Sequence, residues 1–284
     1  LSAPVEEVRE LEHRSIVGSQ WSRPRTILIG QPKGGVGKTP MVALLAGTFG
    51  EVRGGGVLAW DNNETLGTLG IRTAEGRFPT TVLDLLGQLD HFESNGGRRG
   101  DLNAFVRPQP DGHFDVLASD EDPARMAQVG EAEFERIHDV VTRFYPLVLI
   151  DSGNNPRAAN FLAATHHADL LVIPVQWAQD SVESAGRLID QLRRSGYGDL
   201  VQRAVVVATN DGRGRAPTDK CAEWREWFTR TCAAVVDVPF DPHIAERGEL
   251  HYSQLSTATK RAFLAVAAAI TSHLDTYDAW EGSR

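Results

Sequence analysis

One stretch, GQPKGGVGKTP at residues 30–40, constrains this chain more than any other. It follows a short apolar run, TILIG at 26–30, and its lysine–threonine pair opens a helix-length segment. Glycines let backbone N–H groups turn toward phosphate oxygens, and the N-terminus of a helix adds partial positive charge. In such a loop Lys38 reaches the β- and γ-phosphates of a nucleotide, and the Thr39 hydroxyl holds Mg²⁺. The alternative is a glycine turn without a ligand, which the full strand, loop and helix pattern disfavours.

Short apolar runs rich in β-branched residues alternate along the chain with helix-length amphipathic segments. Near-continuous apolar strands separated by helices are typical of a parallel sheet covered on both faces. We therefore predict an α/β fold, a single-domain P-loop NTPase with a mostly parallel twisted sheet and helices on both faces. The strands are expected at 26–30, 56–60, 114–118, 147–150, 170–175, 204–209 and 234–239. The helices are expected at 39–49, 80–91, 123–144, 156–165, 181–195, 217–231 and 256–276.

The length of the chain fits one domain. Its 284 residues, 41% of them hydrophobic, are enough for one large α/β unit. Residues 1–24 are charged and lack a clear strand, so we interpret them as an N-terminal extension of a main domain at 25–284. The stretch ESNGGRRGD at 93–101 is interpreted as a flexible excursion within that domain.

Net charge and hydropathy limit the classes of partner that this chain can bind. A net charge of −9 gives no global basic field toward nucleic acid or anionic lipid, so such binding needs a local patch. The longest strongly apolar run, 262–270, is about half the length of a membrane span. We expect no secretory signal, because the first residues show no charged-then-apolar pattern with a cleavage site. Cys221 and Cys232 are typical of reduced cysteines in a cytoplasmic protein. Because the chain begins without Met, we expect that an upstream segment has been removed.

Two aspartates end predicted strands. Asp151 follows the run LVLI at 147–150, and Asp61 ends the neighbouring strand at 56–60. Ligand sites of α/β proteins lie at the carboxyl ends of the strands, where an aspartate can orient a water bound to Mg²⁺. For both residues the alternative is a structural role, that of a strand-end residue capping a loop.

The loop KGGVGKT, with Pro32 where the ordinary motif has its leading glycine, resembles the deviant Walker A loop of the ParA/MinD family of dimerising ATPases. The resemblance covers about residues 25–275. It includes VLAWDNNETLGTLG (57–70) at switch I, YPLVLIDSG (145–153) at Walker B, ADLLVIPVQ (168–176), VVVATND (205–211) and VPFDPHIAERG (238–248). The resemblance implies an ATPase domain that binds ATP or ADP with Mg²⁺ and forms a homodimer when ATP is bound. It also implies that Lys33 crosses into the partner's site and touches its nucleotide.

The resemblance assigns further roles to single residues. Asp61 and Asn63 occupy the switch I positions that hold Mg²⁺ or the attacking water, so the implied catalytic set is Lys33, Lys38, Asp61 and Asn63. The implied metal set is Thr39, Asp61 and Asp151. The implied nucleotide-binding set is Gly34, Gly35, Val36, Gly37, Lys38, Thr39, Pro40, Asn210 and Pro239. Asn210 and Pro239 are the positions for the adenine base, and the alternatives are a loop turn and a strand stop. Gln176 and Asp180 could face the phosphates or the dimer partner, and we leave them outside the core site.

Two positions depart from the family pattern. Family members that hydrolyse ATP readily usually have D-x-D in switch I, whereas this chain has asparagine at position 63. Asn63 can hydrogen-bond a water but accepts no proton, so we predict slow or partner-dependent hydrolysis. Glu64 is a candidate substitute. Pro40 falls in the first helical turn, where proline is tolerated. It lacks the N–H and hydroxyl that family members use on the α-phosphate, which predicts a weaker grip there.

Surface charge leaves one question open. Arg187, Arg193 and Arg194 lie on one predicted helix, and either they contact DNA non-specifically or they belong to a solvated face. MinD relatives carry a basic amphipathic C-terminal helix for membranes. Here the end, LDTYDAWEGSR, has three acidic residues and one arginine, so no membrane binding is expected.

Three functions compete. The first is a weak cytoplasmic ATPase that positions or segregates DNA or another cargo, as in plasmid partition, with an unknown adaptor or activating protein. The second is a nucleotide-gated scaffold with negligible turnover that recruits a type VII secretion or conjugation component. The segments DVLASDEDP, GTLG and VPFDPHI look most like the actinobacterial branch linked to plasmids and type VII secretion. The third is a P-loop ligase or synthetase similar to dethiobiotin synthetase, which no extra set of acid–base residues supports.

Overall fold

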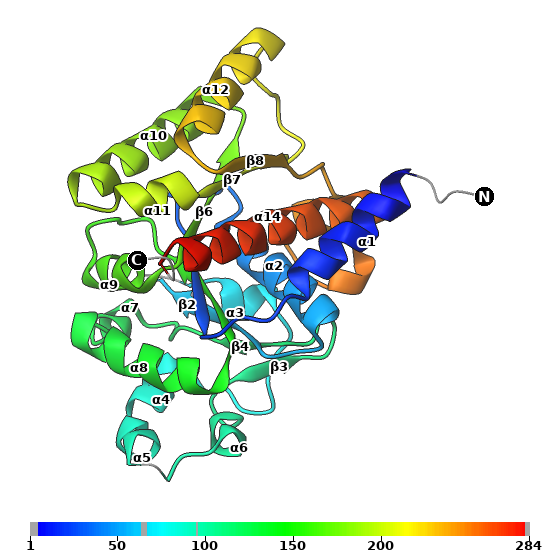
Figure 1. The fold of residues 1–284 in the computed structure, drawn as a ribbon. Coiled ribbons are helices and arrows are strands. Elements are labelled where there is room, and N and C mark those ends of the chain that lie inside the picture. The colour runs from blue at the N-terminus through cyan, green and yellow to red at the C-terminus, as the bar shows by residue number, and fades with distance from the viewer. Residues whose placement is uncertain (1–4, 64–66, 95, 282–284) are drawn as a thin grey trace.

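A computed structural model describes residues 5–63, 67–94 and 96–281 (Figure 1). Within these residues one sheet of eight strands has the order β3-β4-β2-β5-β1-β6-β7-β8. All neighbouring strands pair in parallel except β3 and β4, which pair antiparallel. The strands are β1 (Arg25–Ile29), β2 (Val57–Asn62), β3 (Arg107–Gln109), β4 (Phe114–Leu117), β5 (Leu147–Ser152), β6 (Leu170–Gln176), β7 (Val205–Thr209) and β8 (Ala234–Asp237). The predicted α/β fold with a mostly parallel sheet is confirmed.

The seven strands expected from sequence are all present, because buried parallel strands are continuous apolar runs. The strand that sequence reasoning missed is β3, whose sequence RPQ has no apolar pattern. Pro108 cannot donate a ladder hydrogen bond, and β3 lies at the edge of the sheet, where a proline is tolerated.

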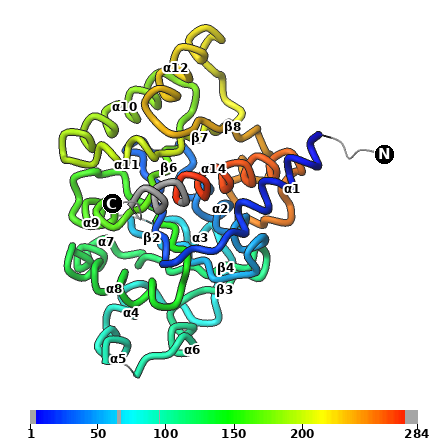
Figure 2. Tube along the Cα trace, in the orientation of Figure 1, coloured from blue at the N-terminus to red at the C-terminus, as the bar shows by residue number. Residues whose placement is uncertain are grey.

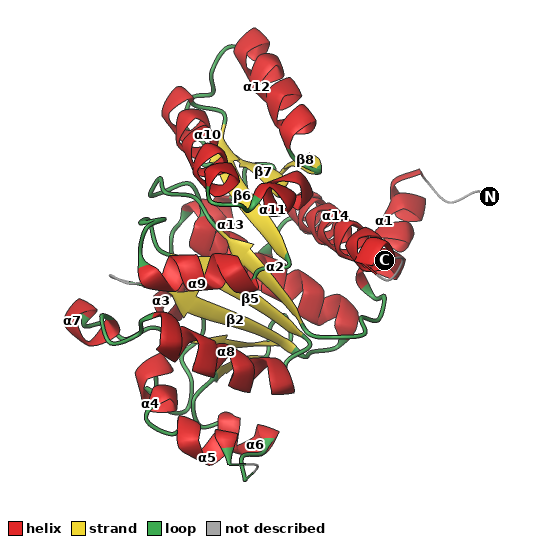
Figure 3. Ribbon diagram, turned by 60° about the vertical axis from the view of Figure 1, so that its left-hand side comes forward, coloured by secondary structure: helices red, strands yellow, loops and turns green. Residues whose placement is uncertain are grey.

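Helices cover both faces of this sheet (Figure 3). Side chains alternate along each strand, so Ile27 and Ile29 of β1 enter one core and Leu28 enters the other. The first core includes residues of α2 (Lys38–Arg53) and α14 (Thr257–Glu281). The second includes residues of α8 (Glu131–Phe144), α9 (Ala159–His167) and α10 (Gln179–Arg194). The other helices are α1 (Val5–Val17), α3 (Leu69–Arg72), α4 (Val82–Leu86), α5 (Leu89–Glu93), α6 (Arg99–Leu102), α7 (Pro123–Met126), α11 (Gly198–Arg203), α12 (Thr218–Thr231), α13 (Pro242–Ala245) and the 3₁₀ turn η1 (Tyr252–Gln254).

Two predicted helices are each divided into two. The segment 80–91 contains α4, which ends at Gly87, and the start of α5. The segment 123–144 contains α7 and α8, and Gly130 caps α8 with its N–H bonded to the Glu133 carboxylate at 3.1 Å. The expected excursion 93–101 includes the beginning of α6. Gly87 at the C-cap of α4 and Gly130 at the N-cap of α8 mark these two breaks, which apolar periodicity does not show.

The described part of the N-terminal extension packs on the rest of the protein. Helix α1 lies against α14, as Figures 1 and 2 show. Arg261 of α14 donates to Glu6 at 2.8 Å and to Glu10 at 3.1 Å. After α1, the Arg53 guanidinium lies 4.0 Å from the centre of the Trp21 ring, and it donates to the Val17 carbonyl at 2.9 Å. The extension is therefore attached along α14 and at the end of α2.

Both cysteines are free, with Cys232 buried and Cys221 half-buried. None of the helices within the described ranges is long and apolar enough to cross a membrane.

A buried histidine gives the fold a pH dependence. His138 of α8 shares a 2.8 Å hydrogen bond between its Nε2 and Thr26 Oγ1, and burial lowers its pKa from 6.5 to about 4. The unfolded chain therefore binds this proton more tightly than the folded one. The contribution to stability is full above pH 6.5 and is lost as the pH falls toward 4. We expect the free energy of unfolding to fall by up to about 3 kcal/mol from this group.

Urea unfolding at pH 7 and pH 4.5 measures this effect. His138→Gln retains a partner for Thr26 without a charge, so most of the pH dependence is expected to disappear. The matched change at exposed His91, His91→Gln, is expected to leave it in place. Equal pH dependence in both variants would contradict the assignment to His138.

Candidate nucleotide-binding site

The glycine-rich loop connects the carboxyl end of β1, in the interior of the sheet, to the start of α2. Gly35 and Gly37 have φ angles of +77° and +93°, a left-handed conformation that suits glycine. A Cβ at Gly35 would meet no atom within 4 Å, so the backbone and not crowding requires glycine there. The helix begins at Lys38 as predicted, and its first backbone bond runs from Met41 N to Gly37 O. Pro40 therefore lies in the first turn, where its missing N–H breaks no helical bond.

Lys38 is buried beneath this loop and is held by three acceptors. Its Nζ donates to the Gln31 carbonyl at 2.7 Å, to the Lys33 carbonyl at 3.1 Å and to Asn154 Oδ1 at 2.6 Å. Sequence reasoning missed Gln31 and Asn154. The signal for Asn154 was its place directly after the Walker B segment 145–153, and Gln31 has no comparable signal.

Side chains from the neighbouring strands brace the loop. Thr209 at the end of β7 donates to the Val36 carbonyl at 3.1 Å. Gln176 at the end of β6 donates to the Gly35 carbonyl at 3.4 Å. The loop conformation is therefore supported by β6 and β7 in addition to its own glycines.

A cavity of about 630 Å³ opens over the loop. The predicted site residues that line it are Gly34, Gly35, Val36, Gly37, Lys38, Thr39, Pro40, Asn63, Asp151, Asn210 and Pro239. Lys33 and Asp61 are not among the lining residues. Lining residues that sequence reasoning did not propose include Thr68, Arg72, Asn154, Arg213 and Arg247. Nine positions, from Gly34 to Pro40 together with Asn210 and Pro239, thus share one cavity although they come from distant parts of the chain.

Thr39 and Asp151 form the part of the site that suits a magnesium ion. The Thr39 hydroxyl donates to Asp151 Oδ2 at 2.6 Å and lies 3.2 Å from the Thr68 hydroxyl. Burial, followed by the nearby charge of Asp61, raises the pKa of Asp151 to about 7. Hydroxyl and carboxylate oxygens are the protein ligands that Mg²⁺ takes beside phosphates and water. The residues present therefore fit the ion.

Asp61 lies beside Asp151 in the register of β2 and β5, yet its own partners are internal. It is fully buried, and its carboxylate accepts the N–H groups of Asn63 and Leu69, each at 3.2 Å, and the Ser119 hydroxyl at 3.0 Å. Burial raises its pKa to about 6. These bonds anchor the segment that follows β2, as the capping interpretation describes. The magnesium role of Asp61 stays a prediction.

The remaining residues predicted for switch I and for the adenine base differ in where the structure places them. Asn63 lines the cavity, whereas Glu64 lies outside the described residues. Asn210 lines the cavity too, and its Oδ1 accepts the Gly212 N–H at 3.0 Å in a turn of its own loop. Base recognition by Asn210 and Pro239 stays a prediction.

Lys33 points to the protein's own surface in the single chain. Its Nζ donates to Asp180 Oδ2 at 2.6 Å, and both side chains are partly exposed. Asp180 lies in the first turn of α10, so the first lysine of the loop is held there rather than over the cavity.

Comparison with known proteins finds a sequence relative and, separately, solved structures of the same fold. No known protein-family profile matches the chain. The chain is 29% identical over 250 residues to the ESX-1 secretion-associated protein EspI of Mycobacterium tuberculosis, a match that covers 86% of this chain and 36% of EspI. The chain thus spans about a third of the length of that relative.

Solved structures share the whole fold. A ParA family ATPase from Chlorobium tepidum superposes with a TM-score of 0.65 at 16% identity, covering 89% of this chain and 97% of that one. The septum site-determining protein MinD from Pyrococcus horikoshii, solved with Mg-ADP, superposes with a TM-score of 0.64 at 17% identity, covering 86% and 94%. The chain therefore has the fold of ParA and MinD ATPases.

Proposed function

We propose that this protein is a ParA/MinD-like ATPase that binds ATP or ADP with Mg²⁺ in the 630 Å³ cavity and forms a homodimer when ATP is bound. The observation that carries the proposal is the placement of Lys38 and the Thr39–Asp151 pair at one cavity, on the loop after β1 and at the end of β5. A relative of the same fold was solved with Mg-ADP, which supports the choice of ligand. We place the protein in the cytoplasm, where its two free cysteines would stay reduced.

Each group has a distinct role in this proposal. Backbone N–H groups of the loop and the Lys38 ammonium bind the phosphates. A bound Mg²⁺, held through Thr39 and Asp151, would neutralise phosphate charge as hydrolysis proceeds. Asn63, which lines the cavity, orients the attacking water without accepting its proton. Hydrolysis is therefore expected to be slow in the protein alone.

Asn63→Asp is expected to raise steady-state hydrolysis, because it places a charged proton acceptor beside the water. A tenfold gain would correspond to about 1.4 kcal/mol off the barrier. Asn210→Asp adds the same charge at another residue of the same cavity and is expected to give no gain. A phosphate-release assay on both variants decides the matter. An already fast wild-type protein, or equal rates in all three proteins, would mean that the water is positioned by other groups.

A second candidate is a nucleotide-gated scaffold with negligible turnover, serving a type VII secretion system. The similarity to EspI, described as associated with ESX-1 secretion, favours it. In this function ATP binding and dimerisation would recruit a secretion component, and Asn63 would keep the ATP-bound state long-lived.

The surface of α10 bears on the choice of cargo. Glu183, Arg187, Asp190 and Arg194 recur at helical spacing and are all exposed, so this stripe alternates in sign. Arg187 lies 3.8 Å from the Glu183 carboxylate. Such a stripe has no net positive charge with which to bind DNA phosphates. The arrangement supports the solvated-face interpretation over DNA contact by Arg187, Arg193 and Arg194.

ATP turnover with and without DNA, together with mass measurement in ADP and in ATP, tests these functions. Turnover stimulated by DNA, and lost in Arg187→Glu/Arg194→Glu, would support DNA positioning. A dimer formed with ATP but without turnover would support the scaffold. Failure to bind either nucleotide would overturn both.

A further inference from the structure

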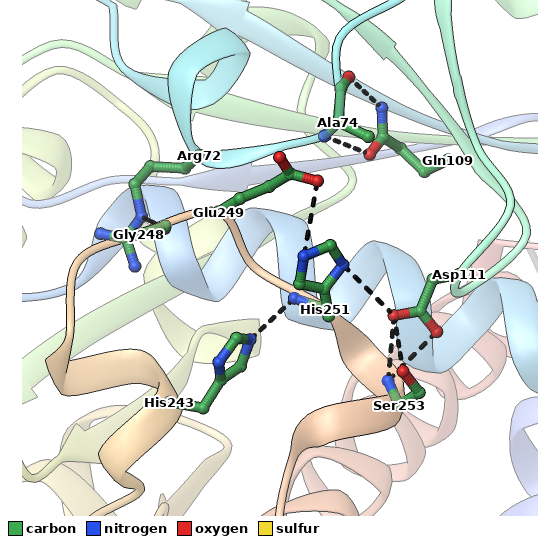
Figure 4. Close-up of polar contacts among 9 residues, drawn as sticks. All are labelled: Arg72, Ala74, Gln109, Asp111, His243, Gly248, Glu249, His251 and Ser253. Carbon is green, nitrogen blue, oxygen red and sulfur yellow. Dashed lines mark hydrogen bonds and ion pairs between the residues drawn. The ribbon is translucent and has the colours of Figure 1, made fainter.

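Arg72, at the end of α3, lines the cavity from outside the P-loop. Its Nε donates to the Gly248 carbonyl at 2.7 Å (Figure 4). Its Nη2 lies 3.4 Å from the Ile244 carbonyl. The carbonyl of Arg72 in turn accepts the Leu250 N–H at 2.8 Å. The guanidinium is therefore held in place between switch I and the segment 244–250.

This segment is anchored at further points, which Figure 4 shows. The His251 N–H donates to His243 Nε2 at 2.8 Å. The Ser253 hydroxyl donates to the Asp111 carboxylate at 3.0 Å. Residues on both sides of the 244–250 segment are thus held in place, with Ser253 bonded to the neighbouring hairpin of β3 and β4.

Arg247 belongs to this segment and lines the same cavity. Burial and then the positive charge of Arg247 lower the pKa of Arg72, so the two guanidinium groups repel each other. Within residues 5–63, 67–94 and 96–281, neither group forms an ion pair with a carboxylate. Arg213, which also lines the cavity, differs because it lies 3.3 Å from Asp211. The protein therefore places two like charges at the cavity without neutralising them.

The backbone conformation at Arg247 is a second unusual feature of this part of the cavity. Its φ of +58° is left-handed, and His113 is the one other non-glycine residue with positive φ in the described part of the chain. Such conformations are unfavourable for residues with a Cβ and are concentrated at ligand sites. Pro40, on the loop side of the cavity, contributes no N–H to an anion. The cavity thus lacks one backbone donor at the loop and is lined by two additional cations from outside the loop.

We propose that Arg72 and Arg247 bind phosphate groups of the nucleotide and hold switch I and the 244–250 segment against it. The proposal rests on nucleotide binding in this cavity. Guanidinium groups match phosphate oxygens in charge and geometry. An anion between the two arginines replaces their mutual repulsion by attraction, which accounts for a pair that the protein leaves without a carboxylate.

Calorimetric titration with ATP, ADP and sodium tripolyphosphate tests the proposal. Arg247→Gly removes the charge and suits the left-handed backbone, so the fold is expected to stay intact. Arg72→Gln removes the charge but keeps a donor for the Gly248 carbonyl. Each is expected to weaken all three ligands about tenfold, whereas Arg247→Lys keeps most of the affinity. Arg215→Gly, at an exposed arginine that does not line the cavity, is the control and is expected to bind as the wild type does.

The outcomes separate this proposal from the one on which it rests. Wild-type affinity in Arg247→Gly and Arg72→Gln, with ATP binding still lost in Lys38→Ala, would overturn the role of the arginines alone. Weaker ATP binding with unchanged tripolyphosphate binding would also overturn it, because the contact would then be to base or ribose. A wild-type protein that binds none of the three ligands would overturn both proposals.

Discussion

Lys38→Ala is expected to weaken ATP and ADP binding by about a hundredfold or more. The ammonium is the one charged side chain that lies within the loop and reaches the cavity in the single chain. Hydrogen bonds to charged groups contribute about 1.5–3 kcal/mol each, and Lys38 is positioned to serve two phosphates. Isothermal calorimetry with each nucleotide measures the loss.

The same substitution also affects the fold, which the experiment has to separate. Lys38 donates hydrogen bonds to the carbonyls of Gln31 and Lys33 and to the side chain of Asn154, so Lys38→Ala leaves these acceptors without that donor. Melting temperatures are therefore measured beside the affinities. Lys33→Ala is the control, since it removes the other lysine of the same loop and is expected to bind nucleotide normally as a monomer. Unchanged ATP affinity in a folded Lys38→Ala protein would reject the P-loop assignment.

Features that depend on residues close together in the sequence were predicted correctly, whereas contacts between distant residues were not. The loop and its flanking strand and helix were predictable because their glycines, lysine and threonine have fixed local spacing. The Thr39–Asp151 contact has a topological reason, because α2 begins just after β1, and β1 pairs with β5, which carries Asp151. In contrast, Asn154 beneath Lys38 and Ser119 on Asp61 bind through side chains whose partners lie 116 and 58 residues away. Composition and hydrophobic periodicity do not predict contacts between single side chains that are so far apart in the sequence.

Asp61 shows a second reason why the structure differs from the sequence prediction. Its position at a strand end predicted proximity to the magnesium site, and it does lie beside Asp151. Its partners, however, depend on how the segment after β2 folds back. A Cβ at Gly67 would lie 2.2 Å from Asp61 Oδ2, so the close approach of that segment requires glycine there. The sequence contains this glycine, but the reason for it is the close approach of the backbone to Asp61, which only the structure shows.

Lys33→Ala is expected to abolish ATP-dependent dimerisation while leaving nucleotide binding by the monomer intact. In the single chain Lys33 pairs with Asp180 at 2.6 Å and does not line the cavity of its own subunit. Partly exposed ion pairs of this kind contribute about 0–1 kcal/mol, so Lys33 can leave Asp180 at little cost and reach a partner's nucleotide. Light scattering with a slowly hydrolysed ATP analogue measures the mass.

The pairing with Asp180 supplies the matched control. If Lys33 acts only by holding α10, Asp180→Ala would abolish dimerisation as completely as Lys33→Ala. If Lys33 acts across the interface, Asp180→Ala releases it from its own subunit, and dimerisation is expected to be retained or strengthened. Retained dimerisation in Lys33→Ala would show that the two subunits do not share a nucleotide through this lysine. The role of the first lysine thus depends on the comparison between these two variants, because each removes one side of the same 2.6 Å contact.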